Sequence, residues 1–466
     1  MSNFARVLRN AANLGTAEAA GRAVGFVRTV VLARVLHAAG YGTFAAAMAF
    51  GVLLAALAEA GLSYFTAREV ARAPHAARRL VWTAYVLHAA LCVAALALGL
   101  AVLPLFRFSG QEALAAMLLL AGACADGMTG QALALFRGRQ RMGVEARVVT
   151  FGRFVLLIGV IAVAVFAPTV LWAAAVTAVG SALTAAIALT VAALAERPVR
   201  PKRRELAAVA RAALPFAASG LLSMIYFRVD VLLLRMLGIA DAPIGAYSAA
   251  YRVMEAPRSA PGVVASGFFP EAARLAREGD RGRLLSLGAR SLTLVVAAVV
   301  PLSVAFVSAP AFITRTLFGV DFSGSAELLR ILAPMPVLMA MNAIAIALVN
   351  ASGGQRRVVT IFSVCTAVNV GANLLLIPLL GVTGAAIATV LTEAVELVAF
   401  VLWIRANFGA LRAPLTGVAV AGATALAAAA FVPGAQGLWR IVVATAAYLG
   451  VLVPLLLIAR RGVAAV

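Results

Sequence analysis

The sequence predicts an all-α integral membrane protein with fourteen transmembrane helices, arranged as two six-helix lobes followed by two C-terminal helices. Three observations predict this fold class. Hydrophobic residues make up 64% of the 466 residues and charged residues only 12%, against roughly half and a quarter in soluble proteins. The apolar residues form blocks long enough to cross a hydrocarbon layer about 30 Å thick. The basic residues between these blocks gather in every second loop.

The predicted helices are the apolar runs between charged, Pro-rich or Gly-rich breaks. They cover residues 11–36, 41–62, 81–104, 114–136, 149–167, 169–195, 212–237, 243–268, 288–308, 328–350, 358–379, 381–404, 413–432 and 438–459. The N-terminal tail, the C-terminal tail and every second loop carry 27 basic residues, while the opposite loops carry only Arg107 and Arg315. Because cytoplasmic loops are enriched in Lys and Arg, we expect a multi-pass protein of the cell membrane with both termini cytoplasmic.

An internal repeat divides the chain into two halves. The segment RVLHAAGYGTFAAAMA, between the first two predicted helices, parallels RMLGIADAPIGAYSAAY, and RVVT at 147–150 recurs at 357–360. Because each half contains an even number of helices, both halves face the same way, which makes the repeat parallel. The predicted domains are the N-terminal lobe, a basic cytoplasmic linker, the C-terminal lobe and the last two helices with their tail: 1–195, 196–211, 212–404 and 405–466.

The net charge of +21 does not indicate a nucleic-acid partner, because topology explains the basic loops and no basic face interleaved with aromatic residues accompanies them. The three cysteines, Cys92, Cys124 and Cys365, stand singly in apolar segments, without the spacing of metal ligands. We find no paired carboxylates, nucleophile with a base, or phosphate-binding loop. The sequence therefore predicts no catalytic residues, no cofactor and no metal site, and argues against an enzyme.

Ten arginines lie in or at the ends of predicted helices, where burial of a charge is costly. Half of them are near helix ends, from which a long side chain reaches the lipid head groups: Arg34, Arg153, Arg235, Arg330 and Arg440. The other half lie deeper: Arg22, Arg28, Arg228, Arg252 and Arg258. Because guanidinium groups bind phosphate through paired hydrogen bonds, these deeper arginines are the predicted site for an anionic ligand.

In the first predicted helix, Arg22 and Arg28 flank one stripe of small residues, about 9 Å apart along the axis. Glu18 is placed to pair with Arg22, whereas Arg28 has no acid close in sequence. In the eighth predicted helix, Glu255 can pair with Arg252 or Arg258. The intramembrane acids allow two alternatives, charge pairing or coupling to H⁺ or Na⁺: Glu18, Asp126, Asp230, Glu255 and Glu393.

Several segments resemble the oligosaccharide flippases of the polysaccharide-export family, within the multidrug/oligosaccharidyl-lipid/polysaccharide exporter superfamily. They are GRAVGFVRTVVLARVLHAAGYGTFAAAMAF, LAEAGLSYFTAREVAR and PFAASGLLSMIYFRVDVLLLRMLG with the following IGAYSAAYRVMEAP. The resemblance implies a two-lobed transporter that moves a polyprenyl-pyrophosphate-linked glycan from the cytoplasmic to the outer leaflet by alternating access. It also implies a protein that works as a monomer or with glycan polymerase or glycosyltransferase partners.

Three other functions stay open as alternatives. The related lipid II flippases have an Arg-x-x-Gly-Phe-x-Arg pattern that matches Arg22, Gly25, Phe26 and Arg28. However, the second predicted helix lacks their arginine, and Thr29 stands where they have an aspartate. A cation-coupled multidrug exporter of the same superfamily would have carboxylates rather than arginines dominating its cavity. A membrane glycan polymerase or ligase would place its acids and arginines in a large outer loop, which this sequence lacks.

Overall fold

The part of the chain that the computed structural model describes, residues 3–256, 259–432 and 437–464, contains helices and turns and no strand. Side chains are described for these residues except in 3–20, 215–219, 223, 259–261, 263, 266 and 456–464. The all-α prediction is therefore confirmed. Lengths and hydropathy of the helices make the protein a multi-pass membrane protein.

Ten helices among the described residues are long and apolar enough to span a membrane. This number is smaller than the predicted fourteen partly because helix α1, Asn3–Glu59, joins two predicted spans across a break in helical geometry at His37. At His37 the backbone angles are φ 57° and ψ 178°, outside the helical region. Helix α16, Thr416–Ala430, is also too short to be included. The count of fourteen helices stays a prediction.

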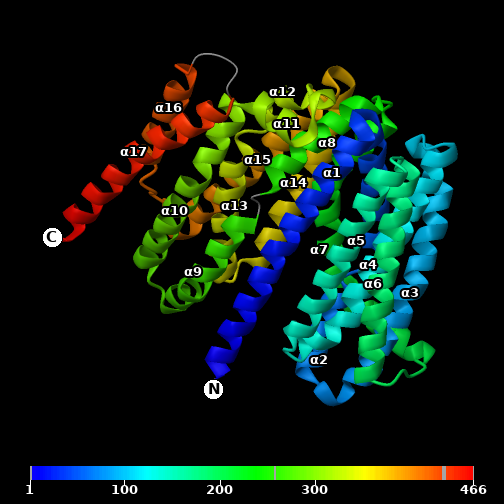
Figure 1. Cartoon of the computed structure of the whole chain (residues 1–466). Helices are drawn as coiled ribbons and strands as arrows, with labels where there is room; N and C mark the ends of the chain where they lie inside the picture. The colour runs from blue at the N-terminus through cyan, green and yellow to red at the C-terminus, as the bar shows by residue number, and fades with distance from the viewer. Residues whose placement is uncertain (1–2, 257–258, 433–436, 465–466) are drawn as a thin grey trace. The chain divides into compact units, whose positions relative to one another are not determined.

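The chain divides into two compact units, Met1–Gly245 and Ala246–Val466 (Figure 1). The first unit contains α1, α2 (Leu62–Arg72), η1 (Pro74–Ala76), α3 (Ala77–Val102), η2 (Leu103–Phe106), α4 (Gly110–Gly138), α5 (Met142–Phe166), α6 (Val170–Ala195) and α7 (Arg203–Met236). The boundary falls within α8 (Asp241–Glu255). The second unit continues with α9 (Ser259–Glu278), α10 (Arg281–Ser308), α11 (Pro310–Phe318), η4 (Val320–Phe322), α12 (Ser325–Ile331), α13 (Met335–Ala351), α14 (Gln355–Leu380), α15 (Val382–Phe408), α16 and α17 (Gly437–Ala464). The lobe boundaries expected from the sequence, with a linker at 196–211, stay a prediction.

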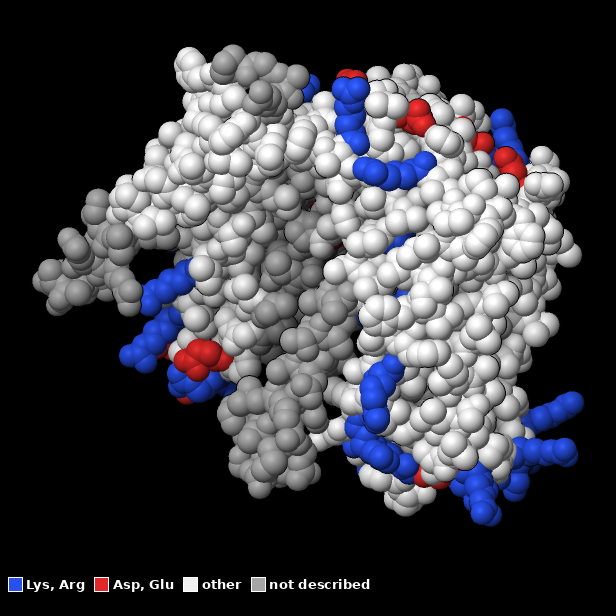
Figure 2. All heavy atoms as spheres, in the orientation of Figure 1, with Lys and Arg blue, Asp and Glu red and all other residues white. Residues whose placement is uncertain are grey.

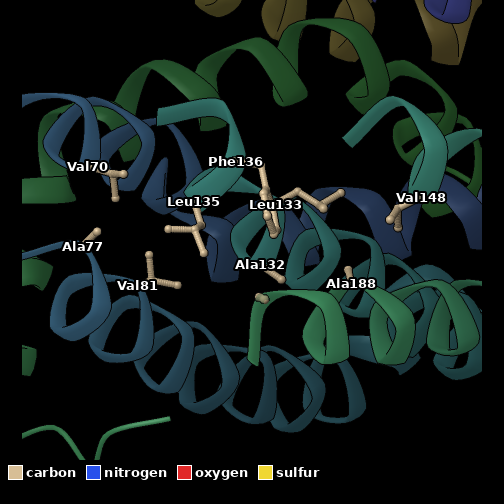
Figure 3. Packing of buried hydrophobic residues seen from close by; sticks show 10 residues of the cluster. Val70, Ala77, Val81, Ala132, Leu133, Leu135, Phe136, Val148 and Ala188 are labelled. Atoms are coloured by element: carbon tan, nitrogen blue, oxygen red, sulfur yellow. The ribbon is translucent and has the colours of Figure 1, made fainter. Parts of the chain in front are cut away.

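Helix α4 is the centre of the first unit, where it packs against α1, α2, α3 and α6. A buried cluster at one end of α4 joins side chains from α2 to α6, among them Leu135 and Phe136 of α4, Val70 of α2 and Val81 of α3 (Figure 3). Several members of the cluster are alanines, such as Ala132. Small side chains let neighbouring helices approach closely. In lipid, where the hydrophobic effect does not drive helices together, such close packing is what holds them.

Basic side chains gather at the end of the first unit where α2 lies, while most of the face shown in Figure 2 is formed by other residues. The start of α3 is tied at this end to the end of α6 and to the start of α7. The indole of Trp82 donates to the backbone carbonyl of Glu196 at 3.0 Å, and the guanidinium of Arg79 lies 2.7 Å from the carboxylate of Glu205. The predicted cytoplasmic loops of this unit therefore meet at one end of it, while their orientation in the membrane stays a prediction.

Helix α1 crosses the start of α8 with the two backbones in contact. A Cβ atom added to Gly42 would overlap the carbonyl oxygen of Asp241, and one added to Gly245 would overlap that of Ala38. Gly42 and Gly245 occur in the two recurring segments, and each is followed two residues later by an aromatic residue. The crossing therefore requires glycine at both positions, because only a residue without a side chain allows this approach.

The variant Gly42→Ala should lower the stability of the protein by about 1 to 3 kcal/mol, because the added methyl group forces the two helices apart. Thermal unfolding of the purified protein in detergent measures the effect. The matched control is Gly25→Ala in the same helix, where an added Cβ meets no atom within 4 Å. If Gly42→Ala unfolded at the same temperature as Gly25→Ala, the close crossing would be wrong.

Candidate functional site

A stripe of small residues on α1 forms the base of the candidate site in the first unit. Gly21, Gly25 and Thr29 recur every four residues and so lie on one face of the helix. The hydroxyl of Thr29 donates to the carbonyl of Gly25 at 3.0 Å. Gly21 is buried because the guanidinium group of Arg153, from α5, lies against it. Space beside Gly25 is open, since an added Cβ there would meet nothing within 4 Å.

Arg153 differs from its predicted role as an arginine that reaches the head groups. It is half-buried, and its guanidinium contacts the glycine stripe of α1. The sequence shows that Gly21 leaves room for another group, but it does not show which helix supplies that group. Arg153 is therefore a candidate site residue that sequence reasoning missed.

Arg28 has an acidic neighbour from a distant part of the sequence. The carboxyl group of Asp126, in α4, lies close enough to the guanidinium of Arg28 for an electrostatic interaction. Helix α4 packs against α1 and so brings the two residues together. Asp126 itself is exposed. The lack of an acid near Arg28 in the sequence therefore does not leave an unbalanced charge in the structure.

The remaining predicted residues of the first unit lie in different surroundings. Arg22 is exposed, and the side chain of its expected partner Glu18 lies outside the described residues. Arg34 is exposed, as predicted for an arginine that reaches the head groups. On α7, Asp230 is buried and accepts a hydrogen bond from the backbone N–H of Val231 at 2.8 Å, whereas Arg228 is half-buried. Asp230 is more buried than Arg228, which agrees with their positions about 200° apart around α7.

In the second unit, the structure pairs the two described members of the predicted cluster on α8. The guanidinium of Arg252 lies 3.1 Å from the carboxylate of Glu255, as their spacing of three residues predicts. The third member, Arg258, lies outside the described residues. The predicted pairing of Glu255 with one of its neighbours is therefore seen with Arg252.

The acid predicted on α15, Glu393, is buried and lies in a polar network that the sequence analysis did not single out. The side-chain amide of Asn342, from α13, donates to the Glu393 carboxylate at 2.7 Å and to its backbone carbonyl at 3.1 Å. Glu396, one turn further along α15, is also buried. The hydroxyl of Thr389 lies 3.3 Å from that of Tyr247. Buried amides in apolar segments are the sequence signal that could have revealed this network, because buried polar groups need hydrogen-bond partners.

Arg235 is predicted to reach the lipid head groups, but the structure buries it. Its side chain is only 9% exposed and forms ion pairs with Glu112, of α4, and Asp241, of α8. It also donates to the carbonyls of Phe106 at 3.3 Å and Arg107 at 3.2 Å, and its guanidinium lies 4.9 Å from the centre of the Phe108 ring. The prediction was wrong because both acids come from other helices, where they neutralise the charge inside the protein.

Comparisons with known proteins give one matching family and several similar structures. The sequence profile of a family described as "Polysaccharide biosynthesis protein" matches residues 7–276. No curated protein matches the chain. The structure is similar to that of the lipid II flippase MurJ in an inward closed conformation, with a TM-score of 0.77 and 13% identity over 93% of this chain and 96% of that chain.

Two further solved structures are similar. An inward-facing multidrug resistance MATE family transporter of the MOP superfamily has a TM-score of 0.65 and 19% identity over 83% of this chain and 94% of that chain. A MOP superfamily transporter from Pyrococcus furiosus, for which reverse polarity of the binding pocket suggests a different function, has a TM-score of 0.59. Its identity is 19% over 86% of this chain and 96% of that chain. At these identities the similarity shows the fold, which is that of MOP superfamily transporters.

The variant Arg235→Gln should destabilise the protein by about 3 to 5 kcal/mol, because it leaves the carboxylates of Glu112 and Asp241 without their buried counter-charge. Thermal or denaturant unfolding in detergent measures the loss. Arg107→Gln is the matched control, since Arg107 is exposed on the same side of the unit and its removal should change stability by no more than about 0.5 kcal/mol. Equal stability of the two variants would contradict a structural role for Arg235.

Proposed function

The chain belongs to the polysaccharide biosynthesis protein family, and on this premise we propose that it is a flippase for a polyprenyl-pyrophosphate-linked oligosaccharide. It moves this lipid-linked glycan from the cytoplasmic to the outer leaflet of the cell membrane by alternating access, for the synthesis of a cell-surface polysaccharide. The two lobes and two additional C-terminal helices, with both termini cytoplasmic, are part of the proposal. The protein works as a monomer or together with the polymerase and glycosyltransferases that use and supply the glycan.

The observation that carries the proposal is the family match over 7–276, because this range includes all the deep arginines of the predicted site. In the fold of a MOP superfamily transporter, guanidinium groups at mid-depth suit a ligand with two adjacent phosphates. Such groups form bidentate hydrogen bonds with phosphate oxygens. We assign the pyrophosphate to these residues: Arg22, Arg28, Arg228, Arg252 and Arg258.

The neighbouring acids support a site that binds and then releases its ligand. Asp126 lies within electrostatic reach of Arg28, and Glu255 is paired with Arg252. When the site is empty, each carboxylate lowers the cost of keeping a guanidinium away from bulk water. An arriving pyrophosphate competes with the carboxylates for the same hydrogen bonds, so part of its binding energy is offset. A transporter needs this balance, because a ligand that binds too tightly leaves slowly.

The alternatives differ in what they require of the site. A lipid II flippase would use the same phosphate chemistry, and Thr29 in place of an aspartate is the feature that argues against it. A multidrug exporter binds organic cations, for which the arginines of α1 and α7 would be repulsive. A membrane glycan polymerase or ligase would leave unpolymerised glycan outside the cell when deleted. Loss of the flippase would instead leave lipid-linked glycan in the cytoplasmic leaflet.

A flipping assay in vesicles with a defined pyrophosphate-linked oligosaccharide tests the proposal. Arg28→Ala and Arg258→Ala should each slow flipping at least about tenfold, because each removes a charge-assisted pair of hydrogen bonds. Arg28→Lys should recover only part of the rate, since an ammonium group lacks the planar fork. Arg147→Ala is the control because it removes an exposed arginine outside the proposed site. Unchanged flipping in both alanine variants would exclude the cationic site.

We further propose that an H⁺ or Na⁺ gradient drives transport through the membrane acids. These are Glu18, Asp126, Asp230, Glu255 and Glu393. In vesicles, collapse of the relevant gradient should slow flipping by the wild type, and Asp230→Asn, which removes a buried carboxylate, should slow it while a gradient is present. Transport that is indifferent to both ion gradients and to the membrane potential would exclude coupling, although flipping itself would remain.

A further inference from the structure

A cavity of about 300 Å³ lies in the second unit, where the end of α10 meets α11, α12 and the start of α17. Three arginines line it: Arg315 from α11, Arg330 from α12 and Arg440 from α17. The sequence predicts head-group contact for Arg330 and Arg440 and places Arg315 in an outer loop. The structure shows that they converge on one cavity.

Nothing in the described part of the chain neutralises these arginines. No Asp or Glu lines the cavity, and no ion pair among the described residues involves any of the three arginines. The adjoining residues 433–436, which the structure does not describe, include no acid. Asp321 and Glu327 are the acids closest in sequence, and neither lines the cavity. The cavity therefore concentrates positive charge without an internal counter-charge.

Two hydrogen-bond donors at the cavity are left without partners among the described residues. The Nε–H of Arg440 and the hydroxyl of Ser308 are buried and have no hydrogen-bond partner there. Both residues line the cavity. Buried donors normally have an acceptor, so the site needs an acceptor that the described residues do not provide. An anion with several oxygen atoms fulfils this requirement together with the charge.

The cavity lies at the end of α10 opposite its basic start. Helix α10 begins at Arg281 and ends at Ser308, so its 28 residues separate the two ends by about 42 Å. The sequence predicts the Ser308 end to be on the outer side, where arginines are disfavoured. Arginines that only anchor a helix reach the lipid head groups independently, and their convergence on one cavity indicates a shared ligand.

We propose that this cavity binds a phosphate group on the outer side of the membrane, separately from the transport site. The guanidinium groups of Arg315, Arg330 and Arg440 supply the paired donors that phosphate oxygens accept. The phosphate belongs either to the head group of an anionic lipid of the outer leaflet or to soluble inorganic phosphate. The proposal does not depend on the transported substrate.

The test uses the full-length protein, purified in detergent and stripped of lipid. Native mass spectrometry measures retention of phosphatidylglycerol, with diacylglycerol as the comparison lipid that has the same acyl chains but no phosphate. In a second arm without lipid, a titration with inorganic phosphate is followed by thermal unfolding. Retention of phosphatidylglycerol alone assigns the site to lipid, and a response to inorganic phosphate assigns it to the soluble ion. Either result supports the proposal.

Arg330→Gln and Arg440→Gln should each weaken binding of the phosphate-containing probe at least about tenfold, because each removes one charge-assisted contact. Arg330 is exposed, so its variant should fold even if Arg440→Gln does not. The control Arg107→Gln removes an exposed arginine that lies in a predicted outer loop of the first unit. The proposal is overturned if the wild type binds neither probe, or if binding by Arg330→Gln equals that by Arg107→Gln.

Discussion

A charge inside the membrane has to be met by a polar group on another helix, and the first unit depends on this constraint. The partners come largely from α4, which supplies Asp126 beside Arg28 of α1 and Glu112 beside Arg235 of α7. Because an unpaired charge in this environment costs several kcal/mol, α1 and α7 are held to α4 more specifically than apolar contacts would hold them. The central position of α4 in the packing therefore has an electrostatic cause as well as a steric one.

The partners can meet only where helices approach closely, and small residues make that approach possible. Gly21 leaves space for the guanidinium of Arg153, and Gly42 allows the backbone of α1 to touch that of α8. In lipid, helices associate through packing and polar contacts, since apolar surface gains little by leaving a hydrocarbon solvent. Glycines in α1 thus have two different roles. Gly21 gives room to a polar side chain, and Gly42 lets two helix backbones cross in contact.

The sequence was sufficient for the fold class, which depends on composition, and for one contact that depends on spacing within a helix. It predicted the all-α membrane class, and the spacing of three residues predicted that Glu255 could pair with Arg252. It could not predict that Asp126 lies near Arg28, because periodicity tells which residues share a face but not which helix that face meets. For the same reason Arg235 was misassigned. Its position near a helix end suggested contact with head groups, while its acids came from α4 and α8.

The two proposed phosphate sites differ in whether carboxylates lie near their arginines. In the proposed transport site, two described arginines have carboxylates nearby, since Arg28 has Asp126 and Arg252 has Glu255. The arginines of the cavity at the end of α10 have none among the described residues that line it. A resident carboxylate competes with a phosphate ligand and so favours exchange, whereas its absence favours retention. A cargo site requires exchange at every cycle. A site without a competing acid is suited to a ligand that stays bound while the cargo passes elsewhere.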